Sequence, residues 1–169
     1  MNAKLIRKKA ISDSQLQLRS KLWPEVKEDD LWNRKKGAGF TTIPRTLPLF
    51  MEMMDSMSNG KPVSKVYLEL WCRSFDEHIV PLSKKEEMAF YCGFGGQRGV
   101  QTWSSRLDIL ATLDFIRTAP GPYGDKSYAL IMNPYRIVAA HRKSKTLGMT
   151  DQLYNSLIAR ASEIKADDI

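Results

Sequence analysis

Residues 97–116 read QRGVQTWSSRLDILATLDFI, a helical pattern that changes to a strand pattern over its last residues. Apolar side chains recur at spacings of three and four, which predicts a helix over residues 97–113 with one buried face. That face consists of Val100, Trp103, Leu107, Leu110 and Leu113. The polar face carries Arg98, Gln101, Ser105 and Asp108. The helix is therefore expected to pack on a core and to present polar groups to solvent.

A β-hairpin is predicted directly after this helix. Residues 115–119 and 127–132 are short apolar segments of the strand type. Residues 120–125 between them read PGPYGD, and glycine, proline and aspartate favour turns. Asn133-Pro134 is expected to close the second strand. The sequence thus predicts two antiparallel strands joined by a long tip.

Two helices are predicted before residue 76. The first has a start signal in Thr41-Thr42-Ile43-Pro44, and Ser58-Asn59-Gly60 is typical of a helix end. Its expected apolar face is Leu47, Phe50, Met51, Met54 and Met57. Ser64 is expected to cap the second helix, in which helical apolar spacing continues from Val66 to Phe75.

A short extended segment and another helix follow. Residues 77–82 end in an apolar run around Pro81, which indicates a short strand. Ser83 and Glu86 have the spacing of a capping box and predict a helix over residues 84–92. The glycines at positions 93, 95 and 96 are expected to end it.

The two ends of the chain differ from this middle part. Residues 1–40 read as an extension, with a short helix that Trp23-Pro24 stops. At the other end, Arg142-Lys143-Ser144-Lys145 precedes an amphipathic helix that Thr150 is expected to cap. We therefore expect three parts: a basic extension (1–40), a central domain (41–140), and a basic linker with a C-terminal helix (141–169).

The order of these elements resembles a winged helix-turn-helix domain. The resemblance rests on residues 84–132 and, with the preceding helices, covers about 90 of the 169 residues. Its most specific part is residues 102–116, where a polar-faced helix steps into a strand. Asn133-Pro134-Tyr135 after the hairpin is similar to winged domains of plasmid and phage replication proteins and of mobile-element regulators. The resemblance implies an α+β fold that is mainly helical, with a small antiparallel hairpin.

Charge is distributed unevenly along the chain, whose formal net charge is +7. Residues 1–40 hold ten basic and five acidic residues, and residues 41–119 hold nine of each. Residues 120–145 hold five basic residues and one acidic residue, while residues 146–169 have two basic and four acidic ones. A basic excess is a hint of an anionic partner. Any affinity for DNA is thus expected to come from the extension and the wing, with the helix supplying selectivity.

In a winged domain the second helix of the pair enters the major groove, and this implies a set of DNA contacts. On the helix these are Gln97, Arg98, Gln101, Thr102, Ser105 and Arg106. At the wing tip they are Tyr123 and Lys126, and in the extension Arg7, Lys8, Lys9, Arg34, Lys35 and Lys36. Two other interpretations stay open: the polar helix face is ordinary solvated surface, and the extension is a solubilising tail or a dimerisation element.

Residue types that carry catalysis or bind metals form no coherent group in the sequence. His78 and His141 are far apart, and Cys72 and Cys92 lack the Cys-x-x-Cys spacing of zinc sites. Both cysteines are expected to be small buried residues. Residues 93–99, GFGGQRG, lack the Gly-Lys-Ser/Thr ending of a phosphate-binding loop. We therefore expect a protein that is not an enzyme and uses neither a metal nor a cofactor.

These expectations combine into one preferred function and two alternatives. Two cysteines, no secretory signal and no spanning helix favour a cytoplasmic protein. The preferred function is selective binding of double-stranded DNA, as a transcriptional regulator or a replication or maintenance factor of a mobile element. The first alternative is a protein-interaction module that uses the scaffold and the C-terminal helix, in a homodimer or on another partner. The second is a small effector or toxin with unrecognised catalytic residues.

Overall fold

The computed structural model describes residues 3–166, with side chains from residue 12 onward. The chain divides into two compact units, Met1–Phe40 and Thr41–Ile169. In the first unit, α1 (Ala3–Leu22) is followed by a single 3₁₀ turn, η1 (Glu28–Asp30). The helix ends one residue before Trp23-Pro24, as expected, although it is longer than the short helix predicted.

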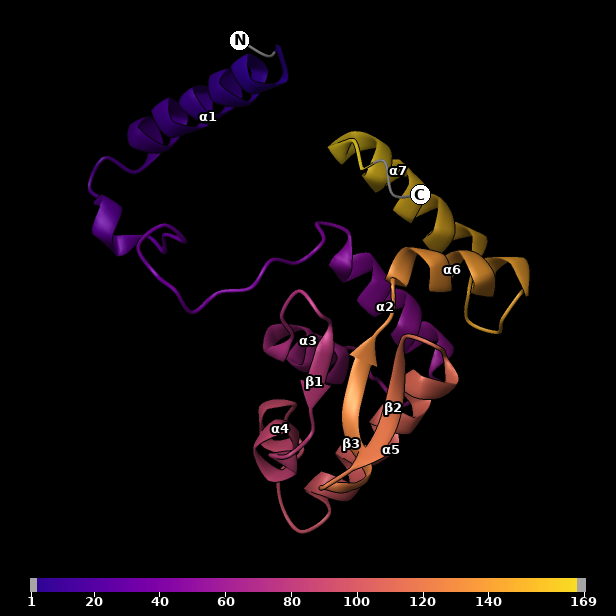
Figure 1. Ribbon diagram of the computed structural model, residues 1–169. Coiled ribbons are helices and arrows are strands. Elements are labelled where there is room, and N and C mark those ends of the chain that lie inside the picture. Colours follow the sequence, from indigo (N-terminus) through magenta and orange to yellow (C-terminus); the bar gives the residue numbers. More distant parts are fainter. Residues whose placement is uncertain (1–2, 167–169) are drawn as a thin grey trace. The chain divides into compact units, whose positions relative to one another are not determined.

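The second unit contains the remaining elements (Figure 1). They are α2 (Leu47–Met57), α3 (Ser64–Arg73), β1 (Ile79–Pro81), α4 (Lys85–Tyr91), α5 (Gly99–Thr112), β2 (Ile116–Gly121), β3 (Gly124–Ile131), α6 (Pro134–Lys143) and α7 (Asp151–Ile164). The expected α+β fold, mainly helical with a small antiparallel sheet, is confirmed. Within residues 3–166, no helix is long and apolar enough to span a membrane.

The sheet has three antiparallel strands in the order β1-β3-β2. Strand β3 pairs with β1 through Val80 and Ala129, and with β2 through Thr118 and the same Ala129. The short segment around Pro81 thus joins the hairpin at the other edge of β3. One face of the sheet contributes Val80, Ala129 and Ile131 to the core, which the helices complete.

The turn of the hairpin is shorter than predicted. Gly121 and Gly124 are already paired, so that only Pro122 and Tyr123 lie between the two strands. The Oγ atom of Ser127 is buried there; it accepts a hydrogen bond from the Tyr123 amide (2.8 Å) and donates one to the Gly124 carbonyl (2.8 Å). These bonds stabilise a tight turn where the proline- and glycine-rich segment predicted a loop of six residues.

Helix α2 begins later than its threonines predicted. Its N-cap is Thr46, which lies beyond the expected caps at Thr41 and Thr42, and Pro48 lies in its first turn. The Thr46 hydroxyl is 2.6 Å from the Tyr135 hydroxyl and is buried, so this threonine serves a tertiary contact with α6. On the apolar face Met53 is fully buried, whereas Met51 is only partly buried.

The caps predicted for α3 and α4 are wrong. Val63 is the N-cap of α3, and a carboxylate of the preceding helix binds the amides at the start of α3: Asp55 Oδ1 accepts from Val63 N (2.6 Å) and Ser64 N (2.8 Å). Helix α3 then ends at Arg73, which leaves Phe75 exposed outside it. Helix α4 has Lys84 as its N-cap without a side-chain cap.

Helix α6 was missed by the sequence pattern. Asn133, expected to close a strand, is its N-cap and accepts a hydrogen bond from the Tyr135 amide (3.0 Å), while Pro134 takes the first helical position. The boundary expected at residue 140 falls inside this helix. Helices α6 and α7 pack on each other and on α2, and Thr150 caps α7 as predicted.

Candidate nucleic-acid interface

Helix α5 separates its buried and polar faces as its sequence spacing predicts, except that Val100 is only partly buried. Trp103, Leu107 and Leu110 are buried to about 1% exposure or less, which anchors the helix on the core. Gln101, Ser105 and Asp108 lie on the exposed side. The first residue of the helix, Gly99, has no room for a side chain, because a Cβ atom there would lie only 2.3 Å from the Phe94 carbonyl oxygen. The loop between α4 and α5 therefore packs directly against the first turn of α5.

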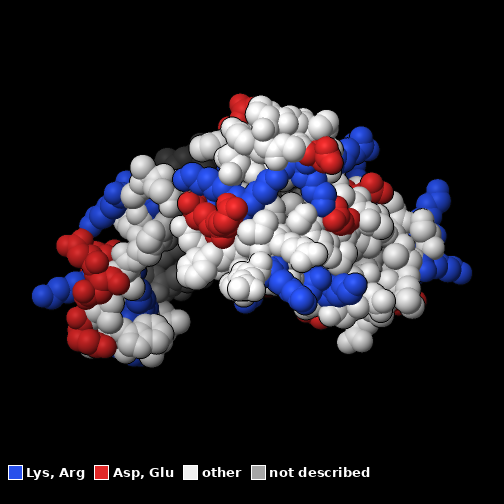
Figure 2. Space-filling view, turned by 90° about the horizontal axis from the view of Figure 1, so that it is seen from below, with Lys and Arg blue, Asp and Glu red and all other residues white. Residues whose placement is uncertain are grey.

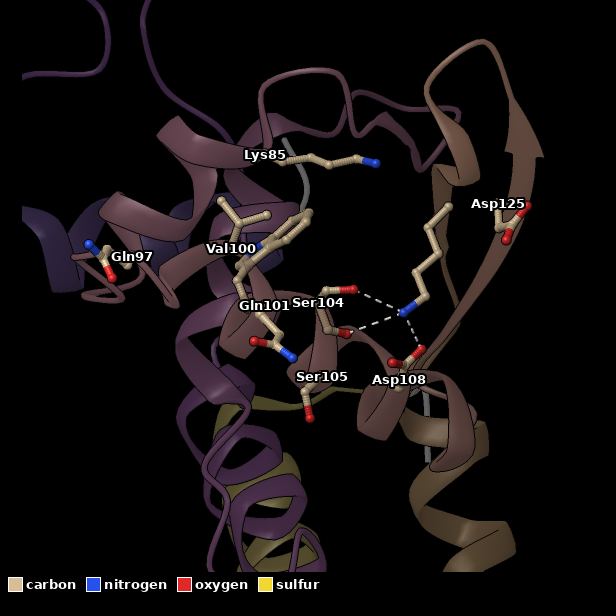
Figure 3. Close-up of a pocket in the computed structure, with 10 residues that line it drawn as sticks. Lys85, Gln97, Val100, Gln101, Ser104, Ser105, Asp108 and Asp125 are labelled. Atoms are coloured by element: carbon tan, nitrogen blue, oxygen red, sulfur yellow. Dashed lines mark hydrogen bonds and ion pairs between the residues drawn. The ribbon is translucent and has the colours of Figure 1, made fainter.

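A groove of about 750 Å³ lies between α5, the hairpin and α4 (Figure 3). Ten residues line it: Lys85, Gln97, Val100, Gln101, Trp103, Ser104, Ser105, Asp108, Asp125 and Lys126. Val100 and Trp103 are its apolar members, and the other eight are polar or charged. The groove therefore offers many hydrogen-bonding groups beside a small apolar surface.

Both lysines of the groove bind groups of the protein itself. Lys126 Nζ, on β3, lies 2.5 Å from Asp108 Oδ1 and 3.0 Å from Ser104 Oγ, both on α5. Lys85 Nζ, on α4, donates to the Tyr123 carbonyl at the hairpin turn (2.8 Å). These contacts tie the hairpin to α4 and α5 and fix the width of the groove.

The charges of the residues that line the groove are balanced. Lys85 and Lys126 are matched by Asp108 and Asp125, so the lining carries no formal net charge. Figure 2 looks at the end of the molecule where the hairpin turn and the α4–α5 loop lie, and basic and acidic side chains are interspersed over it. A ligand of this groove would be held through hydrogen bonds more than through a strong local field.

The structure brings four of the predicted contact residues into the groove: Gln97, Gln101, Ser105 and Lys126. Arg98 is the exposed N-cap of α5 and is not part of the lining. Thr102 and Arg106 are half-buried outside the groove. The Arg106 guanidinium lies 5.9 Å from the centre of the Phe94 ring, and its Nε atom is buried without a hydrogen-bond partner in the described structure. Arg106 is thus part of the packing between α5 and the preceding loop.

The remaining predicted residues lie at the hairpin turn and in the first unit. Tyr123 has an exposed side chain at the turn. Arg34, Lys35 and Lys36 are exposed in the first unit, where Lys36 Nζ lies 2.5 Å from Asp29 Oδ1. The side chains of Arg7, Lys8 and Lys9 lie outside the described residues. The basic extension is therefore partly neutralised by its own acidic residues.

No protein-family model, curated protein or solved structure matches the chain. What the groove does must therefore be argued from its own residues.

Four polar or charged residues of the groove were not among the predicted contacts: Lys85, Ser104, Asp108 and Asp125. Ser104 neighbours Ser105, but its role follows only from Lys126, which reaches it from the hairpin. No sequence pattern pointed to Lys85, because the Tyr123 carbonyl that it binds is 38 residues away in the chain. Helical spacing alone placed Asp108 on the polar face; its pairing with Lys126 required the tertiary fold.

The histidines and cysteines have structural surroundings. His141 bridges the Thr146 hydroxyl and the Leu113 carbonyl, each at 2.9 Å, and so joins α6 to the end of α5. Cys92 is buried as expected, but Cys72 is exposed, which corrects its predicted burial. Among the described residues, no group of three or more histidine, cysteine, aspartate or glutamate side chains is arranged to hold a metal ion.

Proposed function

We propose that this chain binds double-stranded DNA through a winged helix-turn-helix, with α5 in the major groove and the β2–β3 hairpin as the wing. The proposal is supported by the order α3, β1, α4, α5, β2, β3, which is the order that the sequence resemblance implies. The major groove of B-DNA is about 12 Å wide and admits one helix. The observation that carries the proposal is the polar groove, in which residues of α5 face the hairpin.

Phosphate contacts would come from basic groups around the groove. Arg98 at the start of α5 and Lys84 before α4 are exposed, and each is next in sequence to a residue that lines the groove. Helix N-termini and arginine side chains are common partners of phosphate oxygens. The Arg34–Lys36 cluster of the first unit would add contacts that do not depend on base sequence. A regulator or a replication or maintenance factor of a mobile element is the role that fits such selective binding.

The test compares two double variants with the same change in charge. Gln101→Glu/Ser105→Glu places two carboxylates in the groove, and Gln152→Glu/Asn155→Glu places two on the exposed side of α7. Binding of the full chain to a labelled mixed-sequence duplex is followed by fluorescence anisotropy over a range of salt concentrations. We expect the groove variant to lose affinity by about tenfold or more, because like charges that meet at an interface are costly.

The control variant is expected to lose much less affinity, and wild-type affinity is expected to fall steeply with salt. Equal losses in the two variants would contradict a DNA site in the groove. Absence of salt-sensitive binding by the wild-type chain would contradict DNA binding altogether.

A second candidate function is docking of a protein partner on the side of α3 and α4. Phe75 and Phe90 are 82% and 69% exposed, and Tyr91 is 60% exposed. Exposed aromatic side chains are enriched at protein interfaces. None of these three residues lines the groove, so they support a protein partner in addition to DNA. Phe90→Ser should therefore leave the affinity for duplex DNA unchanged, whether or not a protein partner docks at this residue.

A further inference from the structure

One row of uncharged polar side chains runs along the groove side of α5 and the turn before it. It consists of Gln97, Gln101 and Ser105, which follow one another at intervals of four residues, and all three are exposed. Gln101 and Ser105 lie on the same face of α5, because residues four apart in a helix lie one above the other, and Gln97, in the turn before the helix, lines the same groove. Figure 3 shows the row with the hairpin segment that carries Asp125 across the groove from it.

The two carboxamides are available to a ligand. Neither the Gln97 nor the Gln101 side chain makes a hydrogen bond to another residue that the structure describes, whereas both lysines of the groove are bound to protein groups. The next residue along the face, Asp108, is paired with Lys126 and closes the row. Hydrogen-bonding capacity toward a ligand is therefore concentrated in the first two turns of α5 and in the turn that precedes the helix.

The arginines of α5 have other positions. Arg106 packs on Phe94, with its Nε atom buried, and does not line the groove. Arg98 is exposed at the helix N-cap and does not line it either. An arginine or lysine that reads a base in the major groove selects guanine, because its donors match guanine O6 and N7. The groove side of α5 lacks such a guanine reader among its described residues.

A carboxamide has one donor group and one acceptor, which match the N6 amino group and N7 of adenine in the major groove. We infer that, if the chain binds DNA as proposed above, Gln97 and Gln101 read adenines, so that the preferred site contains A·T base pairs beneath the start of α5. Ser105 accepts several bases and adds little selectivity. Arg98 binds a phosphate and fixes the position of the helix without reading sequence.

Selection from a random-sequence duplex library tests this inference with the full chain. Three variants are compared with wild type: Gln101→Ala, Gln101→Arg and Arg98→Ala. Gln152→Ala, on α7, is the matched control for loss of an exposed helical glutamine. All three positions, 98, 101 and 152, are exposed, and circular dichroism of each of the four variants checks that the fold is retained.

We expect wild type to enrich a motif with adenine at two or more positions. Gln101→Ala should lose selection at one of these, with discrimination there falling about tenfold. Gln101→Arg should change that position to guanine. Arg98→Ala should weaken binding to every sequence by a similar factor and leave the motif intact, and Gln152→Ala should change nothing.

Several outcomes would overturn the inference. These are a motif dominated by guanine, a motif that Gln101→Ala leaves unchanged, or a motif that disappears in Arg98→Ala. Salt-sensitive binding without any enriched motif would leave DNA binding in place and reject adenine reading. Failure to bind any duplex would reject the proposed function and this inference with it.

Discussion

The Nζ atom of Lys126 on β3 lies 2.5 Å from Oδ1 of Asp108 on α5. The pair joins the two elements that form the walls of the groove. The lysine side chain is 28% exposed and the aspartate side chain 60% exposed, so water screens the pair and its contribution to stability is at most about 1 kcal/mol. Its larger effect is electrostatic, because it places a carboxylate where a DNA phosphate or base edge would approach.

Asp108→Asn should therefore increase affinity for DNA. The change removes a negative charge from the groove and releases Lys126 for a phosphate, so we expect several-fold tighter binding to mixed-sequence duplex and a steeper dependence on salt. Anisotropy titrations at several salt concentrations measure both quantities. Glu163→Gln is the control, since it removes the same charge from an exposed ion pair with Arg160 on α7. Equal gains in the two variants would mean that net charge alone is responsible.

Asp55→Ala should destabilise the second unit by about 1–3 kcal/mol, because two backbone amides and a hydroxyl lose their acceptor. Asp55 Oδ2 accepts from the Ser64 hydroxyl (2.6 Å) in addition to the amide bonds of Oδ1. Asp55→Asn keeps one oxygen for the amides and should cost less. Urea denaturation of the three proteins gives the free energies of unfolding. Equal costs for alanine and asparagine would show that the bonds to Oδ1 contribute little.

The α5–hairpin core could be predicted from the sequence because its signals are local. Trp103, Leu107 and Leu110 have helical spacing and are buried, and the strand that follows begins at Ile116. The error at α6 is also local in origin. Asn133-Pro134 is a turn signal and a helix start at once, and only the fold shows that the helix start prevails.

The candidate site could be predicted in part, for the same reason. Helical periodicity correctly grouped Gln101 and Ser105 on one face, and both line the groove. Arg106 lies outside the groove because it packs on Phe94, which belongs to a loop whose path the periodicity does not determine. Lys85 could not be predicted, because it contacts the Tyr123 carbonyl 38 residues away and no local sequence pattern indicates such a contact.

Gly148→Ala should be more destabilising than an ordinary loop substitution. Gly148 has φ +89°, and a Cβ atom there would lie 2.3 Å from the Ser56 carbonyl oxygen of α2. We expect a cost above the 1–3 kcal/mol that a positive φ alone brings. Gly60→Ala is the control, because φ is +73° and nothing lies within 4 Å of the added atom. If the urea midpoints of Gly148→Ala and Gly60→Ala fall by the same amount, the loop around residue 148 moves to relieve the clash, and the prediction is wrong.

The two cysteines should differ in reactivity. Burial raises the pKa of the Cys92 thiol to about 12, and its Sγ atom donates to the Lys65 carbonyl. Burial and then the Glu69 charge also raise the pKa of Cys72, but this residue is exposed. Because the thiolate is the nucleophile, Cys92 carries almost none of it in mildly alkaline buffer.

A thiol reagent such as DTNB should therefore modify one cysteine of the native chain quickly and the second only after guanidinium is added. Cys72→Ser should abolish the fast phase, and Cys92→Ser should preserve it. A rise in pH should accelerate Cys72 first, since the pKa of Cys92 lies far above the usual thiol range. Fast labelling of native Cys72→Ser would mean that α4 opens readily and exposes Cys92, which would contradict the stable packing of α4 against α3.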